Sequence, residues 1–190
     1  SGVPCSFLKY LINYAINEED FVMAANEGDA IAICAGASLG GRKSVFLCQN
    51  SGLANAVSPL TSLTYTFKIP VLGFVSLRGE LGLNDEPQHE LMGQITEQLL
   101  DTMKIKHAIL STNLDEAISQ LKEADRFIEN GESFFFIVTK GTFNKVSLKT
   151  FEVAEPVVKK ISYSESDFIP PKRIEALKQV RNSADKDTLI

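Results

Sequence analysis

The chain has 190 residues, 44% of them hydrophobic, and a formal net charge of −5 at pH 7. This length and hydrophobic content predict one compact domain with its own core, followed by a tail. The acidic balance and the lack of any lysine and arginine block argue against nucleic acid as a partner, because phosphate backbones bind clustered cations. No apolar run approaches the roughly 20 residues that a membrane-spanning helix needs.

The three cysteines, Cys5, Cys34 and Cys48, form no CxxC pair. Two of them lie in apolar runs, where a buried thiol is the usual interpretation. An odd number of cysteines without metal-ligand spacing indicates a reduced, cytoplasmic protein. No spacing of His, Cys, Asp and Glu makes a metal site by itself, so we expect no metal ligand on this chain.

Apolar runs and amphipathic segments alternate along residues 1–140. This pattern predicts a doubly wound α/β fold, with a mainly parallel sheet of five to six strands and helices on both faces. We expect strands at residues 21–25, 44–48, 71–76, 108–110 and 134–139. We expect helices at residues 6–14, 30–39, 51–64, 91–103 and 114–129, the second capped by Asn26 and the last by Asn113.

Residues 78–89 form a long loop rich in Gly, Asp, Glu and Pro, and such loops in compact domains are usually functional or mobile. Beyond residue 140 the hydrophobic period is lost and three prolines follow, which predicts a linker that ends in a short helix at residues 171–182. We therefore expect one domain at residues 1–150, and a linker at residues 151–190 that leads toward a missing second domain.

The usual phosphate and nucleophile motifs are absent. Residues 36–44, GASLGGRKS, come close to a P-loop, but an extra residue precedes the lysine, and the segment leaves a helix to enter a strand. No GxSxG elbow is present. Of the two histidines, His107 opens a predicted strand, where an ordinary structural role is expected. For His89, at the end of the loop, a proton-transfer role and a plain loop role stay equally open.

Glu27 stands where an apolar strand-like run meets a helix of small residues. An acid in the first turn of a helix complements the helix dipole, a contribution of about 0.3–1 kcal/mol, but Asp29 can already serve this role. The helix that follows is small and apolar on every side, which predicts burial all round. We therefore predict that Glu27 is held away from water, near a subunit or domain interface.

Four short motifs follow one another along the chain: GVPCS (residues 2–6), NEGDA (26–30), QNSGLANA (49–56) and DEPQH (85–89). Together they resemble the pyrimidine-binding domain of thiamine-diphosphate-dependent phosphonopyruvate decarboxylase, and the resemblance covers nearly all of residues 1–150. The sulfopyruvate decarboxylase α-chain is similar in the same places and is the alternative. An interaction domain without catalytic activity, which dimerises through the apolar helix, is the alternative of a different class.

The resemblance implies a carboxy-lyase of phosphonate biosynthesis that converts 3-phosphonopyruvate to phosphonoacetaldehyde and CO2. It implies that Glu27 hydrogen-bonds N1′ of the cofactor's aminopyrimidine and favours its imino tautomer. It also implies further site residues: cofactor contacts at Gln49, Asn50, Ser51 and Gly52, proton transfer at Gln88 and His89, and substrate contacts at Cys5 and Ser6. Cys5 stands where the wider class often has an aspartate, so an acid role there is in doubt.

Arg78 is our candidate for a phosphonate contact, because a guanidinium matches phosphate-like oxygens. The acidic loop that it begins would repel a dianion unless its carboxylates turn away. The resemblance also implies Mg²⁺ held by a Gly-Asp-Gly run on a separate diphosphate-binding domain, and this chain has no such run. The active site would then form with another subunit, in a homodimer or larger assembly, and the fragment alone would be inactive. We interpret the long tail as favouring phosphonopyruvate decarboxylase over the stand-alone α-chain.

Overall fold

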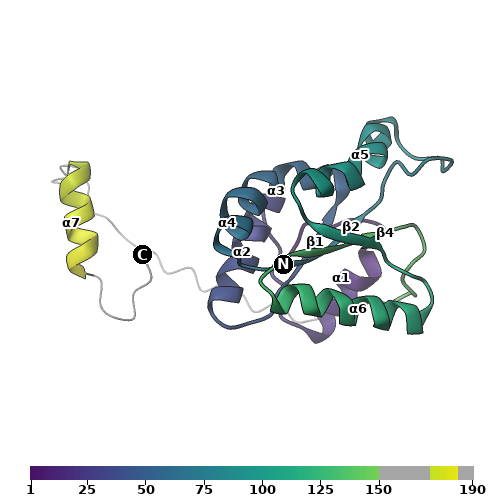
Figure 1. Ribbon diagram of the computed structural model, residues 1–190, viewed down its shortest axis with the longest axis horizontal. Coiled ribbons are helices and arrows are strands. Elements are labelled where there is room, and N and C mark those ends of the chain that lie inside the picture. Colours follow the sequence, from purple (N-terminus) through teal and green to yellow (C-terminus); the bar gives the residue numbers. More distant parts are fainter. Residues whose placement is uncertain (150–171, 184–190) are drawn as a thin grey trace. The chain divides into compact units, whose positions relative to one another are not determined.

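The computed structural model describes residues 1–149 and 172–183, and the chain divides into two compact units, Ser1–Thr150 and Phe151–Ile190. The strands of the first unit are β1 (Val45–Gln49), β2 (Leu72–Ser76), β3 (Lys106–Ile109) and β4 (Phe134–Val138). Its helices are α1 (Lys9–Glu18), α2 (Glu27–Leu39), α3 (Leu53–Pro59), α4 (Tyr65–Phe67), α5 (Glu90–Thr102) and α6 (Leu114–Glu129), with short turns η1 (Asn50–Gly52), η2 (Leu60–Thr64) and η3 (Pro87–His89) (Figure 1).

The four strands form one parallel sheet in the order β1-β2-β4-β3. The central strand β4 reads FFFIV, and all of its residues are buried. A continuous apolar run of this kind is typical of a parallel strand that helices cover on both faces. The predicted α/β class with a parallel sheet is confirmed.

Two short extended segments continue the sheet beyond β1. Gly2 forms a parallel bridge to Leu47 on one side and another to Met23 on the other. The predicted strand at residues 21–25 is therefore reduced to a single bridge, and the expected five to six strands correspond to four strands and two bridged segments. The approach at Gly2 is close, since a Cβ there would lie 2.3 Å from the carbonyl oxygen of Leu47.

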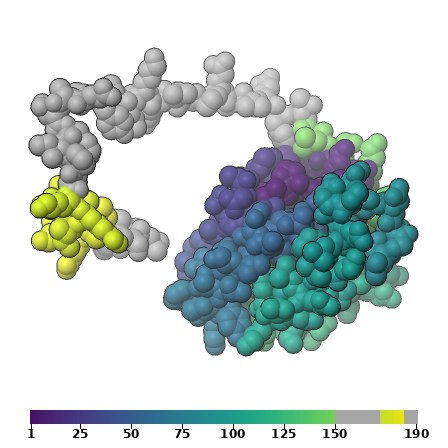
Figure 2. Space-filling model, turned by 90° about the horizontal axis from the view of Figure 1, so that it is seen from above, coloured from purple at the N-terminus to yellow at the C-terminus, as the bar shows by residue number. Residues whose placement is uncertain are grey.

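Alternate strand residues face two separate cores. On one face Phe46, Cys48 and Phe135 pack with residues of α2, α3 and α5, while on the other Leu47 and Phe136 pack with residues of α1 and α6. Figure 2 looks onto the first side, where the blue of α3 and α4 lies beside the teal of α5. Successive side chains of a strand point to opposite faces of the sheet. Apolar residues on both faces therefore pack against helices on both sides, as expected.

Within this single chain the helix after Glu27 is buried on one face, and the predicted burial of its other face against another subunit or domain stays a prediction. In α2 the buried residues are Glu27, Ala30, Ile31, Cys34 and Ala35, at helical spacing. The opposite face carries Ile33, 37% exposed, and Leu39, 67% exposed. A helix on the outer layer of a sheet covers it with one face only, so the second apolar face of α2 is open surface in this chain.

Both predicted asparagine caps are present. The Asn26 side chain accepts a hydrogen bond from the backbone N–H of Asp29, and the Asn113 side chain accepts from those of Asp115 and Glu116. The Asn113→Ala variant is expected to lower the free energy of unfolding by about 1 kcal/mol, because these two N–H groups lose their acceptor. Urea denaturation checks this, with Asn130→Ala at the other end of α6 as control. Equal losses in the two variants would contradict a capping role.

In the second unit the structure describes α7 (Arg173–Ser183), close to the predicted helix at residues 171–182. The backbone N–H of Lys172 donates to Glu175 Oε2 at 3.0 Å, a contact that caps the helix start. Most of the predicted linker lies outside the described residues. Across residues 1–149 and 172–183, no helix combines the length and apolar character that crossing a membrane requires.

Candidate active site

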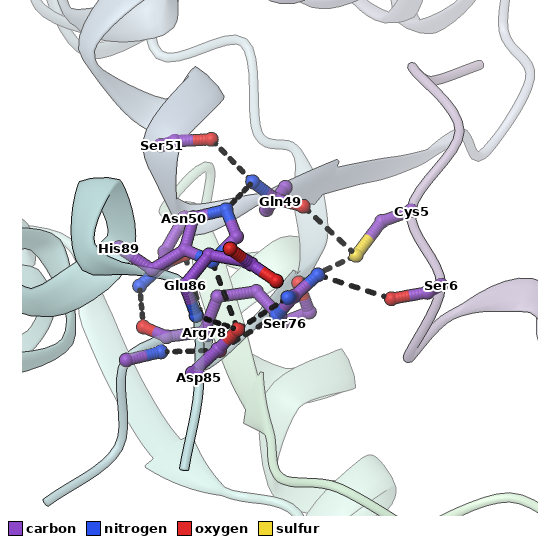
Figure 3. A network of polar contacts seen from close by, with 11 residues as sticks. Cys5, Ser6, Gln49, Asn50, Ser51, Ser76, Arg78, Asp85, Glu86 and His89 are labelled. Carbon is purple, nitrogen blue, oxygen red and sulfur yellow. Dashed lines mark hydrogen bonds and ion pairs between the residues drawn. The ribbon is translucent and has the colours of Figure 1, made fainter.

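The candidate residues gather where the parallel strands end. Gln49 is the last residue of β1, and Arg78 lies two residues beyond the end of β2. Cys5 and Ser6 reach the same place from the N-terminal segment, and His89 comes from η3, at the end of the long loop (Figure 3). Open α/β sheets bind ligands at this carboxyl edge, so the arrangement is suited to a binding site.

Glu27 is buried at the first turn of α2, with 7% of its surface exposed. Its Oε2 accepts a hydrogen bond from Asn55 Nδ2 at 2.8 Å. The carboxylate lies directly against Gly52, where a Cβ would come within 1.9 Å of Glu27 Oε1. Asp29, in contrast, is exposed in the first turn of α2, and its Oδ2 accepts a hydrogen bond from Nδ2 of the cap residue Asn26 at 2.7 Å.

Gln49 links three side chains at the end of β1. Its Nε2 lies 2.6 Å from Ser51 Oγ and 3.2 Å from His89 Nε2, and its Oε1 accepts from Cys5 Sγ at 3.7 Å. Cys5 Sγ also lies 2.8 Å from Ser76 Oγ. The predicted residues Cys5, Gln49, Ser51 and His89 therefore form one connected polar group.

Arg78 is held by several neighbours. Its Nε donates to Asp85 Oδ2 at 2.7 Å, its Nη2 donates to Asp85 Oδ1, and its Nη1 donates to Ser6 Oγ at 3.2 Å. The guanidinium carbon lies 5.0 Å from the centre of the Phe7 ring, a cation–π arrangement. We expected the carboxylates of the loop to turn away if Arg78 binds a dianion. Asp85 instead faces Arg78 and compensates the positive charge of the guanidinium.

Asn50 ties three elements together. It is fully buried, and its Nδ2 donates to the carbonyl oxygen of Arg78 at 2.8 Å and to Thr96 Oγ1 at 3.0 Å. Its Oδ1 accepts from the backbone N–H of Arg78 at 3.3 Å. The carboxamide thus fixes the end of β1 to the exit of β2 and to α5. This gives Asn50 a positioning role, while its predicted cofactor contact stays a prediction.

Gln88 is the predicted residue that stands apart. It is exposed, and among the residues that the structure describes no side-chain hydrogen bond involves it. Seven of the ten predicted residues lie together around the ends of β1 and β2 in Figure 3. Gly52 follows them in η1 and Glu27 lies against Gly52, so only the Gln88 side chain has no recorded contact with this group among the described residues.

The structure also places at the site five residues to which the sequence motifs gave no role: Ser76, Asp85, Thr96, Asn55 and Lys140. Asp85 and Asn55 stand inside the quoted motifs, DEPQH and QNSGLANA, so the signal for them was at hand. Thr96 could have been found only from packing, because it reaches the site from the second turn of α5.

A cavity of about 510 Å³ opens beside this group. It is lined by Phe7, Leu77, Arg78, Glu80, Leu83, Asn84, Asp85, Glu86, Pro87 and Lys140. Lys140, just beyond β4, is exposed and brings a second cation to it. A larger cavity of about 690 Å³ lies at the opposite edge of the sheet, where Val45 and Leu72 begin β1 and β2. Its lining is partly apolar and also includes Arg42, Lys43, Lys122, Asp125 and Glu129, but none of the predicted site residues, so size alone does not locate the site.

All three thiols are unpaired and buried, and burial raises the pKa of the Cys34 and Cys48 thiols, so both stay protonated at neutral pH. In the two described stretches, residues 1–149 and 172–183, no group of three or more His, Cys, Asp and Glu side chains could hold a metal ion.

The pKa of Asp85 is held well below its usual range, chiefly by the hydrogen bonds from Arg78 and also by the backbone N–H groups of Gly79 and Glu86. A lowered folded-state pKa stabilises the fold above the unfolded value of about 3.9, and this contribution is lost as the pH falls below it. Asp85→Asn is therefore expected to destabilise the domain at neutral pH and progressively less below about pH 4. Urea unfolding across this range checks the difference, and a constant difference would contradict it.

Comparison with known proteins identifies the family. Over 118 residues, 61% of the chain, it is 43% identical to phosphonopyruvate decarboxylase from Streptomyces viridochromogenes and covers 30% of that protein. Over 134 residues, 70% of the chain, it is 39% identical to sulfopyruvate decarboxylase subunit alpha from Methanococcus maripaludis and covers 79% of that subunit. The chain belongs to the family of phosphonopyruvate and sulfopyruvate decarboxylases.

Family membership confirms the resemblance found in the four motifs. The chain spans about three tenths of the phosphonopyruvate decarboxylases that it matches. No protein-family model matches the sequence. Among solved structures, the fold is similar to that of benzoylformate decarboxylase from Polynucleobacter necessarius, with a TM-score of 0.59 and 20% identity over 82% of this chain and 29% of that one. This likeness concerns the fold, and it supports the α/β architecture described above for this chain.

Proposed function

We propose that the chain is the pyrimidine-binding part of a thiamine-diphosphate-dependent decarboxylase that converts 3-phosphonopyruvate to phosphonoacetaldehyde and CO2. The observation that carries the proposal is the buried Glu27 carboxylate against Gly52, at the carboxyl edge of the sheet of a chain from the decarboxylase family. A carboxyl group that is largely buried can hydrogen-bond a ring nitrogen of a cofactor with little competition from solvent.

The residues present fit such a ring. Asn55 holds one oxygen of Glu27, and the side-chain hydrogen bonds of the described residues include none to the other, Oε1. Oε1 lies over the Cα of Gly52, where any larger residue would displace it. The absence of a side chain at Gly52 thus makes room for the Glu27 carboxylate, and the hydrogen bond from Asn55 orients that carboxylate as an acceptor for a ring nitrogen.

Within this proposal each residue has a task. Glu27 holds a proton at N1′ of the aminopyrimidine, and Gln49, Asn50, Ser51 and Gly52 form the turn against which the ring lies. When bound, thiamine diphosphate supplies the carbon nucleophile and the electron sink for the loss of CO2. His89 and Gln88 exchange protons with the substrate, Cys5 and Ser6 contact it, and Arg78 binds its phosphonate with Lys140 as a second cation at the cavity.

The remaining parts of the enzyme are proposed to lie elsewhere. Mg²⁺ and the diphosphate would be held by a separate diphosphate-binding domain, toward which residues 151–190 lead. The open apolar face of α2, with Ile33 and Leu39, would pack on another subunit in a homodimer or larger assembly. Three buried, unpaired cysteines suit a reducing compartment such as the cytoplasm. The proposed product keeps its carbon–phosphorus bond, which suits a role in phosphonate biosynthesis.

A second candidate is the α subunit of sulfopyruvate decarboxylase. It is favoured by the 79% coverage of the Methanococcus maripaludis subunit. Phosphonate and sulfonate substrates differ in charge and in proton content but share three oxygens on one atom, which Arg78 and Lys140 could bind in either case.

The test supplies the chain with a diphosphate-binding partner, thiamine diphosphate and Mg²⁺, and measures CO2 release from 3-phosphonopyruvate and from sulfopyruvate. We expect turnover with a higher kcat/KM for 3-phosphonopyruvate. A higher kcat/KM for sulfopyruvate would support the second candidate. Absence of both turnover and cofactor binding would favour the interaction domain without catalytic activity.

A further inference from the structure

Asp85 is the most highly connected polar side chain of the site, and the motifs assigned it no role. We propose that Asp85 is a positioning residue, whose carboxylate fixes the Arg78 guanidinium and the His89 imidazole relative to each other and holds the ring hydrogen of His89 on Nδ1. The expected effect of Asp85 on catalysis rests on the proposed function. The orientation of Arg78 and the tautomer of His89 do not depend on it.

The carboxylate accepts hydrogen bonds on both oxygens. Oδ2 accepts from Arg78 Nε at 2.7 Å and from the backbone N–H of Gly79 at 2.8 Å. Oδ1 accepts from Arg78 Nη2, from the backbone N–H of Glu86 at 2.8 Å and from His89 Nδ1 at 3.0 Å. The Asp85 side chain is 12% exposed, so little water competes with these donors. One carboxylate thus joins both ends of the long loop.

The pairing with Asp85 uses two of the three nitrogens of the Arg78 guanidinium and leaves Nη1 to face other partners. Its Nε and Nη2 form the two-pronged pair with Asp85, the geometry in which guanidinium and carboxylate bind most strongly. Its Nη1 points to Ser6. Because Asp85 compensates the charge, Arg78 acts in this site as a directed donor whose orientation depends on Asp85.

The contact with His89 determines which ring nitrogen carries the hydrogen. At neutral pH the Asp85 carboxylate can only accept, so the nitrogen that faces it, Nδ1, must donate. In the neutral ring Nε2 is then an acceptor, and it faces the amide nitrogen of Gln49 at 3.2 Å.

The roles along the chain of contacts agree with this assignment. The Gln49 amide donates through Nε2 to Ser51 and to His89, and its Oε1 accepts from the Cys5 thiol. If the oxygen and nitrogen of the Gln49 amide were exchanged, Oε1 would face the unprotonated Nε2 of His89, and two acceptors would oppose each other. The amide nitrogen would then face the Cys5 thiol, which also contacts Ser76. One set of hydrogen positions therefore satisfies Asp85, His89 and Gln49 together, with an unprotonated Nε2 directed toward the end of β1.

The experiment measures the tautomer of His89 by ¹⁵N nuclear magnetic resonance of the 190-residue chain at a pH where the ring is neutral. The chain has only two histidines, so His107 serves as an internal reference. We expect Nδ1–H for His89 in the wild type and loss of this preference in Asp85→Ala, because the acceptor is gone. We expect Arg78→Lys to retain Nδ1–H, since Asp85 remains in place.

Two results would overturn the proposal: Nε2–H for His89 in the wild type, or Nδ1–H that persists in Asp85→Ala. If Asp85→Ala does not fold, the wild-type spectrum still decides, since it reads the tautomer directly. In the enzyme assembled with its diphosphate-binding partner, Asp85→Ala is expected to lower kcat by about 10²-fold through misalignment. An inactive wild type with the expected tautomer would reject the proposed function alone and leave the positioning role intact.

Discussion

Replacing Glu27 by glutamine is expected to lower the decarboxylase activity of the assembled enzyme by about 10²-fold or more, the usual contribution of a positioned acid or base. Glutamine has nearly the same size, so it can lie against Gly52, and its amide oxygen can still accept from Asn55. What it lacks is the exchangeable proton that Glu27 shares with the pyrimidine ring in our proposal. The measurement is CO2 release at saturating thiamine diphosphate and Mg²⁺.

The matched control is Asp29→Asn, an acid-to-amide change two residues along the same helix. Asp29 is exposed and contacts the cap residue Asn26, so this change is expected to alter stability by no more than about 1 kcal/mol and to leave kcat unchanged. Cofactor affinity, measured by calorimetry, should weaken in Glu27→Gln only. Full turnover of Glu27→Gln would remove Glu27 from the mechanism, and equal losses in both variants would indicate a general effect on α2.

The location of the site was predictable because it follows from where strands end. Gln49 and Arg78 both follow apolar runs that had to be parallel strands, and the carboxyl ends of parallel strands share one edge of the sheet. The burial of Glu27 was also predictable, since the first turn of α2 has two carboxylates and Asp29 alone can complement the helix dipole.

The partners of these residues could not be predicted in the same way. The motif DEPQH showed that Asp85 was present, but whether it repels a ligand or binds Arg78 depends on the path of the loop, which no periodic pattern determines. The exposed face of α2 could not be predicted from the sequence pattern either. The composition of the helix is apolar all round, yet which face is buried depends on where the sheet lies, and only packing reveals that Ile33 and Leu39 face outward.

The path of that loop depends on a close backbone crossing, and this makes Gly93→Ala the substitution with the largest expected effect on stability. A Cβ on Gly93 would lie 1.8 Å from the carbonyl oxygen of Gly79 and 2.2 Å from its carbonyl carbon. Gly79 in turn has a φ of +75°, and a Cβ on it would lie 2.1 Å from the carbonyl oxygen of His89. Backbone atoms on both sides cannot rotate away as a flexible side chain could.

The added methyl group must therefore push the start of the loop off α5, and Arg78 and Asp85, which flank this crossing, would move with it. We expect Gly93→Ala to lower the free energy of unfolding by about 3 kcal/mol, the upper part of the range for overpacking. For a chain of this length, the corresponding fall in Tm is roughly 6–12 °C. Calorimetry checks the stability, and the His89 tautomer should become mixed in the same variant because Asp85 no longer faces the ring.

Gly36→Ala is the matched control, since it makes the same chemical change in the body of α2 where a Cβ meets nothing within 4 Å. There the methyl group only restricts the unfolded chain, so the free energy of unfolding should rise by about 0.5–1 kcal/mol. The two glycine variants are thus expected to differ in sign. A Gly93→Ala protein as stable as the wild type would mean that the loop lies away from α5 in solution, and the positions assigned to Arg78 and Asp85 would have to be revised with it.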